Sequence, residues 1–524
     1  MKFTNKTKTK LFIFAICLNF ILRYQLIHHE SGIDSFEMHL LANSISEFGQ
    51  ARWWLYPLSI IGMYPNSYAS AISFFTSGIS QCTGIGIEPS IYLYGIFLSF
   101  FSFFAVYILA SKFYDDDFFK FITALLYSIS PGIVEYSTWT AQGRSFFILM
   151  FPMLLYFLVQ NIKKHKVRFI FLAFIVTIFL MTTHHLFFYL MPIFFASLMT
   201  KLIYKLNKNL QINKHFEILQ PLLIIFAFCL VVTYPFITGK FMTLPSKWGN
   251  LLNVINEYPR YIGIPILISI GGFFYIILKK NKRYGEWFVI IAPLSLGVFV
   301  FDTMYTKWIM IIFAILIAGI GVTNIQKLDN KRRKYGTTLI IVIILFSTFF
   351  TGYFQILRFQ LIKEYNYKTI DENTYETGMW VDNRVDGISI GNSRWDTWKI
   401  AAISTQPFLT GSSSADQAYG LVDARDYELE KKSITSEEFW KDSPYSRIKG
   451  MTSDGYWQLI MAQYYSSKGF QYVKLFNINY LVESIELGGN WKSQHGNQTS
   501  EFVTYTHQSK DCIFNSGKWE IWKI

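Results

Sequence analysis

The chain has 524 residues, of which 52% are hydrophobic, 19% are aromatic and only 16% are charged. A soluble domain has roughly 25% charged residues, and here apolar residues recur in runs of 16 or more, which excludes a disordered chain and a single soluble globule. The net charge of +13 would suit a nucleic-acid partner, but residues 1–352 carry +16 and residues 353–524 carry −3, so the excess belongs to the apolar part.

Apolar stretches along the first two thirds of the chain predict membrane-spanning helices. Lys and Arg concentrate on alternate connecting segments, so that one face of the predicted bundle holds 23 of them and the other face holds 7. The positive-inside rule therefore places the N-terminus and the basic face in the cytoplasm, in a multi-pass protein of the plasma membrane. We expect about eleven spans, at 11–27, 91–111, 118–134, 145–161, 168–183, 186–203, 218–237, 262–278, 286–301, 308–325 and 337–353.

Two long segments remain on the outer side of this predicted membrane. Residues 28–90 form a long first outer loop with two helical stretches, and residues 354–524 form a C-terminal extracytoplasmic domain of lower apolar content. The predicted fold is therefore a polytopic α-helical membrane module at 1–353 followed by a mixed α/β domain. The tail has a helical stretch at 425–470 and strand-like stretches at 378–381, 388–391, 472–475, 479–482 and 518–523.

The first outer loop begins with a short acidic motif. Asp34 lies just after the first predicted span, and Glu37 and His39 follow within about one helical turn of it. Two carboxylates three positions apart share a helix face, where one accepts a proton from a substrate hydroxyl or both hold a divalent cation such as Mg²⁺ or Mn²⁺. The alternative is that Asp34 caps an amphipathic helix at 35–48 and Glu37 lies in its first turn.

The second outer loop holds another acid and an arginine. The planar guanidinium of Arg144, at the membrane edge, suits the phosphate of a lipid, and Glu135 is a candidate for a second carboxylate of the site. The alternatives are that Arg144 reaches toward lipid headgroups and that Glu135 is simply exposed.

Later outer segments supply further polar candidates. His184 and His185 lie between two predicted spans, where they either pack between helices or contact a phosphate or sugar. Arg260 and Lys307 are outer-face cations that either bind a phosphate or anchor the chain at the interface. The sequence also allows two structural predictions, one for an acidic run and one for a pair of cysteines. The acidic run at 115–117 is predicted to be a solvated turn, and Cys82 with Cys512 is a possible disulfide pair.

Taken together, these features resemble the GT-C superfamily of integral-membrane glycosyltransferases, which includes protein O-mannosyltransferases, aminoarabinose transferases and the catalytic subunits of oligosaccharyltransferases. The resemblance rests on a cytoplasmic N-terminus, on the acidic stretch Asp34-Ser35-Phe36-Glu37-Met38-His39 at the start of a long first outer loop, on a second acid-bearing loop around Glu135, and on a soluble C-terminal outer domain.

The resemblance implies an inverting transfer of a sugar from a polyprenyl-phosphate donor to a glycan, lipid or protein on the outer face. Asp34 would then be the catalytic base or a metal ligand, with Glu37 or Glu135 as its partner, while Arg144, Lys307 and Arg260 would bind the donor phosphate. The tail lacks a Trp-Trp-Asp-Tyr-Gly-like signature, so a transferase of single sugars fits better than an oligosaccharyltransferase.

Two other functions remain open from the sequence. The chain is alternatively a non-enzymatic envelope or assembly protein that presents its tail to a partner. A flippase for lipid-linked sugars would need polar residues along its spans, and spans such as 308–321 and 337–350 have almost none.

Overall fold

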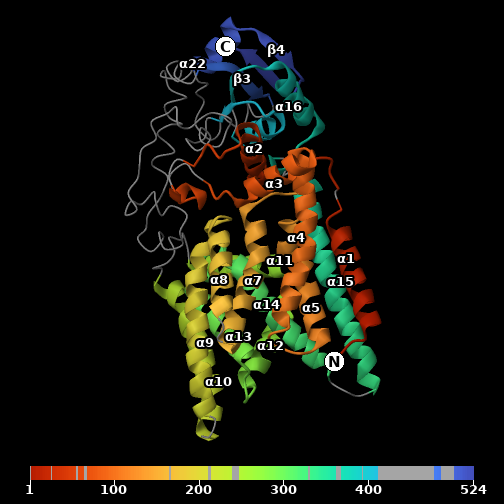
Figure 1. The fold of residues 1–524 in the computed structure, drawn as a ribbon, viewed down its shortest axis with the longest axis vertical. Helices are drawn as coiled ribbons and strands as arrows, with labels where there is room; N and C mark the ends of the chain where they lie inside the picture. Colours follow the sequence, from red (N-terminus) through yellow and green to blue (C-terminus); the bar gives the residue numbers. More distant parts are fainter. Residues whose placement is uncertain are drawn as a thin grey trace.

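The structure is a computed structural model of the chain. It describes residues 2–24, 26–54, 57–63, 68–164, 167–210, 214–238, 247–327, 331–361, 367–391, 394–410, 477–485 and 501–524. A long helical bundle carries a layer of shorter helices at one end, and a small mixed α/β unit lies beyond that layer (Figure 1). The predicted fold class is therefore confirmed. The stretches predicted at 425–470 and 472–475 lie outside the described residues.

Each predicted span overlaps a helix of the bundle. These helices are α1 (Asn5–Leu22), α4 (Ile87–Ala110), α5 (Asp117–Ser128), α7 (Gly143–Lys164), α8 (Val167–Met181), α9 (Leu190–Leu210), α10 (Lys214–Thr238), α12 (Pro265–Leu278), α13 (Tyr284–Leu296), α14 (Thr306–Gln326) and α15 (Lys331–Leu361). Among the described residues, α4, α7, α9, α14 and α15 are each long and apolar enough to cross a bilayer alone. A sixth candidate is α12 with the helix before it, bent by 101°. Eleven crossings therefore remain a prediction.

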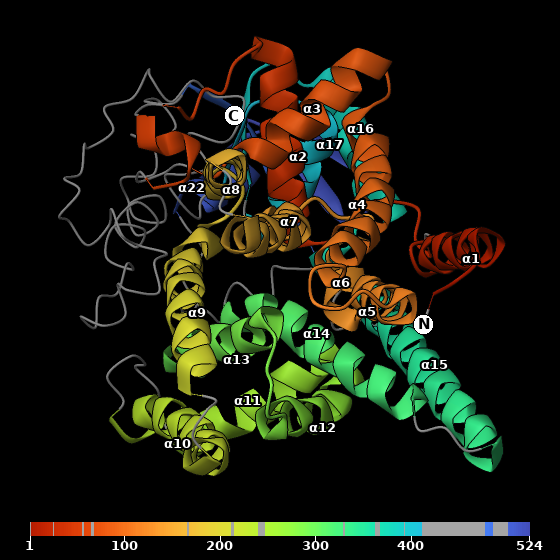
Figure 2. The same cartoon turned by 60° about the horizontal axis from the view of Figure 1, so that its bottom comes forward.

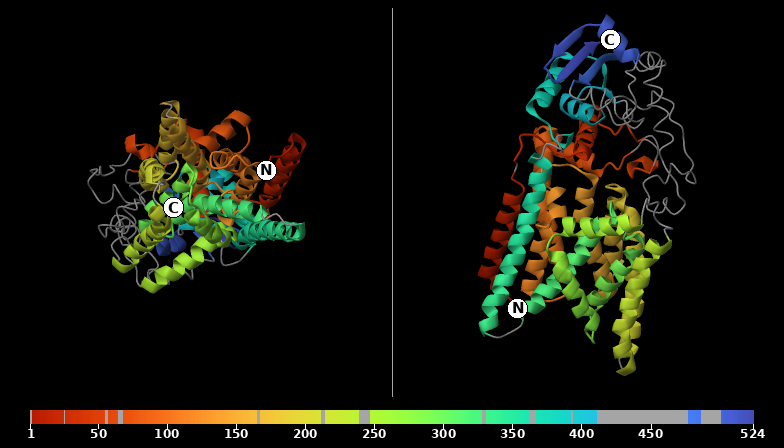
Figure 3. Two further views of the ribbon diagram at one scale, coloured as in Figure 1. Left: turned by 90° about the horizontal axis from the view of Figure 1, so that it is seen from below. Right: turned by 180° about the vertical axis from the view of Figure 1, so that it is seen from behind.

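Helix α14 lies at the centre of the bundle and α15 lies at its edge. The apolar window of α14 is 72% buried, whereas that of α15 is 28% buried and leaves its Phe and Ile side chains to face outward. Glycines allow close packing at the centre: a Cβ at Gly272 would lie 2.3 Å from the carbonyl oxygen of Ile317, and one at Gly319 would lie 2.1 Å from the hydroxyl of Thr123. At the edge, α1 and α15 run side by side (Figure 3).

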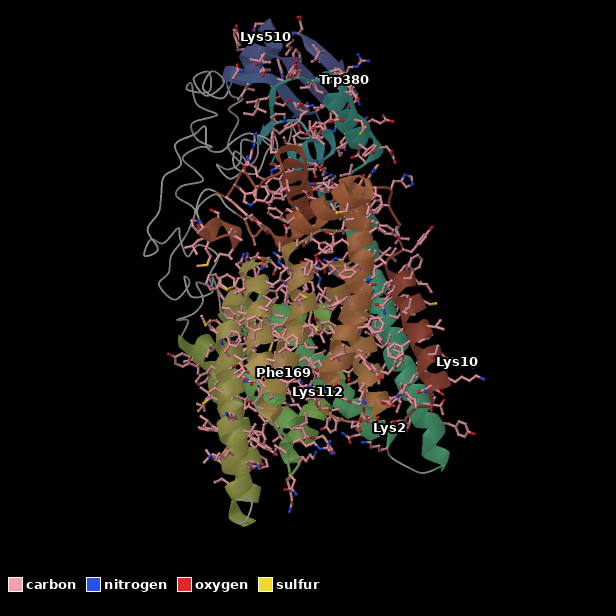
Figure 4. All side chains as sticks on the ribbon, in the orientation of Figure 1. Lys2, Lys10, Lys112, Phe169, Trp380 and Lys510 are labelled. Atoms are coloured by element: carbon pink, nitrogen blue, oxygen red, sulfur yellow. The ribbon has the colours of Figure 1, made fainter. Side chains whose placement is uncertain are left out.

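The end of the bundle away from the α/β unit is basic. Lys2, Lys10 and Lys112 lie at this end, whereas Trp380 and Lys510 lie at the other (Figure 4). The prediction of a solvated acidic turn at this end holds for Asp115, which is exposed, and is wrong for Asp116 and Asp117, which are buried. The side chain of Asp117 is only 3% exposed and lies 3.1 Å from Lys8 Nζ and 3.0 Å from Lys120 Nζ, so it ties α1 to α5. Asp116 caps α5 by accepting from two backbone N–H groups.

Shorter helices cover the opposite end of the bundle. The first outer loop folds into α2 and α3, as its two helical stretches predict, and these pack against each other and against α4. This layer contains α2 (Ile33–Phe48), η1 (Pro57–Ile60), α3 (Ala71–Thr83), α6 (Pro131–Glu135), η2 (His185–Tyr189), α11 (Lys247–Ile262) and η3 (Gly297–Phe299).

The C-terminal unit is a five-stranded sheet with the strand order β2-β1-β3-β5-β4. Its strands are β1 (Ile388–Gly391), β2 (Phe408–Thr410), β3 (Ile478–Ser484), β4 (Cys512–Asn515) and β5 (Trp519–Lys523). β1 pairs in parallel with β2 and β3, and β5 pairs antiparallel with β3 and β4. Three of the predicted strands, at 388–391, 479–482 and 518–523, are confirmed.

Three helices accompany the sheet: α16 (Glu372–Arg384), α17 (Arg394–Ser404) and α22 (Glu501–Ser509). The strand predicted at 378–381 is wrong, because these residues lie inside α16. Asp371 caps that helix by accepting from the N–H of Thr374 at 3.0 Å, and Gly378 packs against Ile403 of α17. Cys82 and Cys512 are both free, so the structure contains no bridge between them.

Helix α2 joins the membrane module to the C-terminal unit. Its Leu40 belongs to the core formed by Val381, Val482 and Trp519, and its Phe36 packs with Trp398. The side-chain amide of Asn43 donates to the carbonyl oxygen of Ala402 at 2.7 Å. Figure 2 shows α2 beside α17.

Candidate functional site

A cleft of about 160 Å³, open to solvent, lies where the outer helices meet the segment that follows α15. Three residues predicted from the sequence meet in it: Asp34, Glu135 and Arg144. The complete lining consists of Ser31, Gly32, Ile33, Asp34, Glu135, Tyr136, Thr138, Thr140, Gln142, Arg144, Ile356 and Lys368.

Asp34 lies in the first turn of α2 and does not cap it. The N-cap is Gly32, with a φ of 104° and no side-chain cap, so the alternative of a capping aspartate is wrong. The side chain of Asp34 is 35% exposed at the cleft, and the N-terminal end of the helix dipole stabilises its negative charge. The backbone before it is fixed, because the N–H of Gly32 donates to the carbonyl oxygen of Lys368 at 2.7 Å.

A buried carboxylate, Glu30, holds the start of α2 against the second outer loop. Glu30 is fully buried and accepts from the hydroxyl of Ser35 at 2.8 Å. The same hydroxyl accepts from the backbone N–H of Ala141 at 2.8 Å. This chain of bonds connects the loop that carries Asp34 to the loop that carries Arg144.

Arg144 faces Asp34 across the cleft. Its Nη2 atom lies 3.8 Å from the Asp34 carboxylate, and its Nη1 atom donates to the hydroxyl of Tyr136 at 3.0 Å. Arg144 lies at the start of α7, where the chain bends closely: a Cβ at Gly143 would lie 2.7 Å from the carbonyl oxygen of Thr183. The guanidinium is therefore held in place with part of its donor fork directed into the cleft.

Glu135 lies at the end of α6, on the wall of the same cleft. The side-chain amide of Gln355, from α15, donates to its carboxylate at 2.7 Å. Burial raises the pKa of Glu135, while the Gln355 bond and the charges of Arg260, Lys368 and Lys307 act in the opposite direction. Glu135 is therefore a desolvated carboxylate within a group of cations.

The predicted phosphate-binding residues Lys307 and Arg260 both contact an acid that the sequence did not point to. Glu257 of α11 accepts from Lys307 Nζ at 2.6 Å and from Arg260 Nη1 at 3.4 Å. Lys307 Nζ also lies 3.8 Å from the centre of the Tyr261 ring. Lys307 and Arg260 are outside the lining of the cleft and act on it through Glu135.

Lys368 is a further cation of the site. It belongs to the short segment between α15 and α16 and lines the cleft directly. Burial lowers the pKa of Lys368, and the charges of Arg260 and Arg358 act in the same direction, against those of Glu135 and Asp34. The lining of the cleft therefore holds two cations, Arg144 and Lys368, and two carboxylates, Asp34 and Glu135, and its cations are of the kind that bind a phosphate.

Four further predicted residues, in addition to Lys307 and Arg260, lie away from the cleft lining. Glu37 is buried on α2, and His39 of the same helix has its Nδ1 atom 2.6 Å from Glu30, so it belongs to the buried support of the cleft. The rings of His184 and His185 lie 3.8 Å apart. His184 Nδ1 accepts from the N–H of Leu186, a structural role at the start of η2.

Asp34 and Glu37 were expected to hold a metal ion together. Glu37 does not line the cleft, and the charged group found beside Asp34 is Arg144. Among the described residues, the one group of three or more His, Cys, Asp or Glu side chains with converging ligand atoms lies in the C-terminal α/β unit. The cleft holds two carboxylates, Asp34 and Glu135, together with Arg144 and Lys368, and a Mg²⁺ or Mn²⁺ ion bound there through one or two carboxylates remains a prediction.

Several site residues had no clear pattern in the sequence. Gln355 lies within an apolar span, where one amide among Phe and Ile residues could have indicated a buried partner. Tyr136 directly follows Glu135, and Glu30 lies four residues before Asp34. Both residues could have been predicted to lie near the site from their closeness in sequence to these two acids. Lys368 and Glu257 reach the site through tertiary packing alone.

The comparisons with known proteins agree with this architecture. No protein-family model and no curated protein sequence matches the chain. The structure is similar to the oligosaccharyltransferase of Archaeoglobus fulgidus in the apo form, with a TM-score of 0.55 and 11% identity over 91% of this chain and 70% of that chain. A structure of the same enzyme with Zn and sulfate has a TM-score of 0.56, with 12% identity over 94% of this chain and 70% of that chain.

A second kind of membrane enzyme is similar over nearly its whole length. ArnT from Cupriavidus metallidurans, bound to undecaprenyl phosphate, has a TM-score of 0.51 and 9% identity, and the match covers 99% of this chain and 98% of that chain. Both enzymes are GT-C glycosyltransferases, so this chain has the GT-C fold.

Proposed function

We propose that the chain is a GT-C glycosyltransferase that moves a sugar from a polyprenyl-phosphate donor to an acceptor on the outer face of the membrane. The observation that carries the proposal is the pairing of Asp34 and Arg144 across one cleft in this fold. One group is suited to take a proton, and the other is suited to bind a phosphate. The similarity to ArnT bound to undecaprenyl phosphate supports a donor of this class.

The proposed reaction is a single displacement. Asp34 takes the proton of the acceptor hydroxyl while the hydroxyl oxygen attacks the anomeric carbon of the donor sugar. The bond between that carbon and the phosphate oxygen breaks, and its electron pair leaves with the polyprenyl phosphate. Attack from the face opposite the leaving group inverts the anomeric centre. No nucleotide is needed, because the lipid phosphate is itself the leaving group.

The cations around the cleft stabilise this leaving group. Arg144 presents planar donors that match a phosphate, and Lys368 adds a charge that is already desolvated, so little reorganisation is needed when negative charge develops. Lys307 and Arg260 are held by Glu257 and contribute charge from behind Glu135. Glu135 in turn keeps these cations together when no donor is bound.

The experiment is a transfer assay with purified protein and radiolabelled polyprenyl-phosphate sugars. Loss of a general base lowers a rate by roughly 10²–10⁴-fold, so we expect Asp34→Asn to lower transfer by at least about a hundredfold. Glu47→Gln is the matched control, because Glu47 lies on the same helix and is exposed. Full activity in Asp34→Asn would rule out the assignment of the base.

The competing function is a non-enzymatic envelope protein that binds a partner through its tail. It predicts that Asp34→Asn leaves the function of the protein unchanged. The buried network behind Asp34 argues against it, since Glu30, Ser35 and Ala141 fix a carboxylate that a scaffold would not need.

A further inference from the structure

Two glutamates lie directly opposite each other in the C-terminal sheet. Glu483 of β3 pairs with Glu520 of β5 in the antiparallel register, so both side chains emerge on the same face. Side chains opposed in this way are about 5 Å apart at Cβ, and like charges there destabilise a sheet. Glu483 is only 7% exposed, so little solvent is available to screen the repulsion.

A histidine from another element completes the group. His507 of α22 places its Nε2 atom 2.5 Å from a carboxylate oxygen of Glu483, and its ring lies 4.7 Å from that of Trp522. One ligand atom from each of Glu483, His507 and Glu520 lies within 4.8 Å of the others. The opposite face of the sheet is occupied by the apolar core of Val482, Trp519 and Ile521, so this polar group is separate from that core.

We propose that Glu483, His507 and Glu520 bind one divalent transition-metal ion of the Zn²⁺ class, which fastens α22 to β3 and β5. Two carboxylates balance the charge of such an ion, whereas a protonated histidine balances only one of them. One imidazole and two carboxylates are ligands that Zn²⁺ accepts, while Ca²⁺ and Mg²⁺ prefer oxygen ligands alone. A partly exposed histidine leaves room for water as the fourth ligand.

The ligand atoms need only small movements to bind an ion. In a tetrahedral site with bonds of about 2.0–2.2 Å, the ligand atoms lie roughly 3.3 Å apart. The hydrogen bond between His507 and Glu483 would lengthen, and the Glu520 carboxylate would approach. Asn515 already orients that carboxylate, because its amide donates to the Oε1 atom of Glu520 at 2.9 Å.

The first test measures binding by the purified full-length protein after it is stripped of metal with a chelator. Titration with Zn²⁺, or with Co²⁺ followed by its visible absorption, should reveal one ion per chain at this site. Glu520→Gln and His507→Gln should each weaken binding by at least about tenfold, as even changes behind a ligand do. Glu376→Gln, an exposed glutamate of α16, is the matched control and should bind as the wild type does.

The second test measures thermal unfolding, because the effect of Glu520→Gln on the unfolding temperature depends on whether the ion is bound. Without metal, Glu520→Gln removes a like charge beside Glu483, so it should unfold at a higher temperature than the wild type. Added Zn²⁺ should raise the unfolding temperature of the wild type and should leave that of Glu520→Gln nearly unchanged. Equal stabilisation of both proteins by Zn²⁺ would overturn the proposal.

A third variant separates this site from the catalytic cleft. Asp34→Asn should bind the ion with unchanged affinity, whatever its effect on sugar transfer. If Asp34→Asn abolished binding while His507→Gln retained it, the ion would belong to the cleft and the proposal would fail. The outcome for transfer therefore does not decide the outcome for the metal.

Discussion

The Nη2 atom of Arg144 lies 3.8 Å from the Oδ2 atom of Asp34, although the two residues come from different outer loops. This separation is too long for a hydrogen bond, so the pair is close enough to interact but does not close the cleft. The tyrosine hydroxyl at 136 holds the guanidinium from the other side. Arg144 is therefore positioned to leave the Asp34 carboxylate and bind a phosphate that enters the cleft.

The first prediction concerns this guanidinium. Hydrogen bonds to charged groups contribute roughly 1.5–3 kcal/mol, so Arg144→Ala should raise the KM for the lipid-linked donor by about ten- to a hundredfold. Arg144→Lys keeps the positive charge but lacks the planar set of guanidinium donors, so its KM for the donor should lie between those of the wild type and Arg144→Ala. Initial rates against donor concentration measure both effects, with the exposed Arg384→Lys as control. An unchanged KM in Arg144→Ala would remove Arg144 from the donor site.

The second prediction concerns pH and Lys368. Burial lowers the pKa of Lys368 from the ordinary lysine value of about 10.4. Its positive charge is therefore lost at a lower pH than for an exposed lysine, and kcat/KM should fall as pH rises through that lowered pKa. Arginine stays charged throughout this range, so Lys368→Arg should move the alkaline limb of the profile to higher pH. If the alkaline limb of the kcat/KM profile does not move in Lys368→Arg, the titrating group is not Lys368.

The third prediction compares two glycines with positive φ at the two ends of α2. At Gly32, φ is 104° and an added Cβ would lie 2.8 Å from the amide nitrogen of Gln142, whereas at Gly49, φ is 65° and nothing lies within 4 Å. Both alanine variants should lose roughly 1 kcal/mol or more from backbone strain, but only Gly32→Ala should also lower transfer. Thermal unfolding and the transfer assay together measure this difference. Equal activity losses in the two variants would show that the contact with Gln142 is unimportant.

The fourth prediction concerns the junction between the first outer loop and α16. His29 Nδ1 lies 3.1 Å from Glu88, and His29 Nε2 lies 3.7 Å from Glu372. Burial alone would lower the pKa of His29, but the hydrogen bond and charge of Glu88 and the charge of Glu372 outweigh it and raise that pKa.

A raised histidine pKa stabilises the folded state at low pH. The contribution is complete below the unfolded value of about 6.5 and is lost as pH rises through the raised value. The unfolding temperature of the wild type should therefore decline over this interval, and His29→Gln should remove that part of the decline. An identical pH dependence in the two proteins would contradict the assignment.

The helices and the central acid of the cleft were predictable because each depends on a local pattern. Apolar runs indicated the bundle, and an acid placed after the first span indicated Asp34. The choice of Glu37 as its partner failed to match the cleft lining, because spacing on a helix says which residues share a face but not what that face contacts. Lys368 and Glu257 reach the site through the packing of α15 and α11, which no local pattern encodes.

The C-terminal unit was predictable in its strands and less so in its helices. β5 alternates buried and more accessible side chains, and β3 is buried along nearly its whole length, as apolar strand patterns predict. In contrast, 378–381 resembles a strand but follows the capping residue Asp371 and continues its helix. The pairing of Glu483 with Glu520 depends on the register of strands far apart in the chain, so the metal-binding group had no counterpart in the sequence.

The position of Asp34 depends on both halves of the chain, because α2 packs against the C-terminal unit. Phe36 and Leu40, on the helix that begins beside Asp34, pack in clusters with Trp398 and Val482 of the C-terminal unit. Truncation of the chain after α15 would expose the apolar side chains of α2 to solvent. Both an enzyme and a scaffold would then lose function, so this truncation does not distinguish the two functions. A chimaera with another membrane transferase must therefore exchange α2 together with the C-terminal unit. If only one of the two is exchanged, Asp34 will be displaced from the cleft.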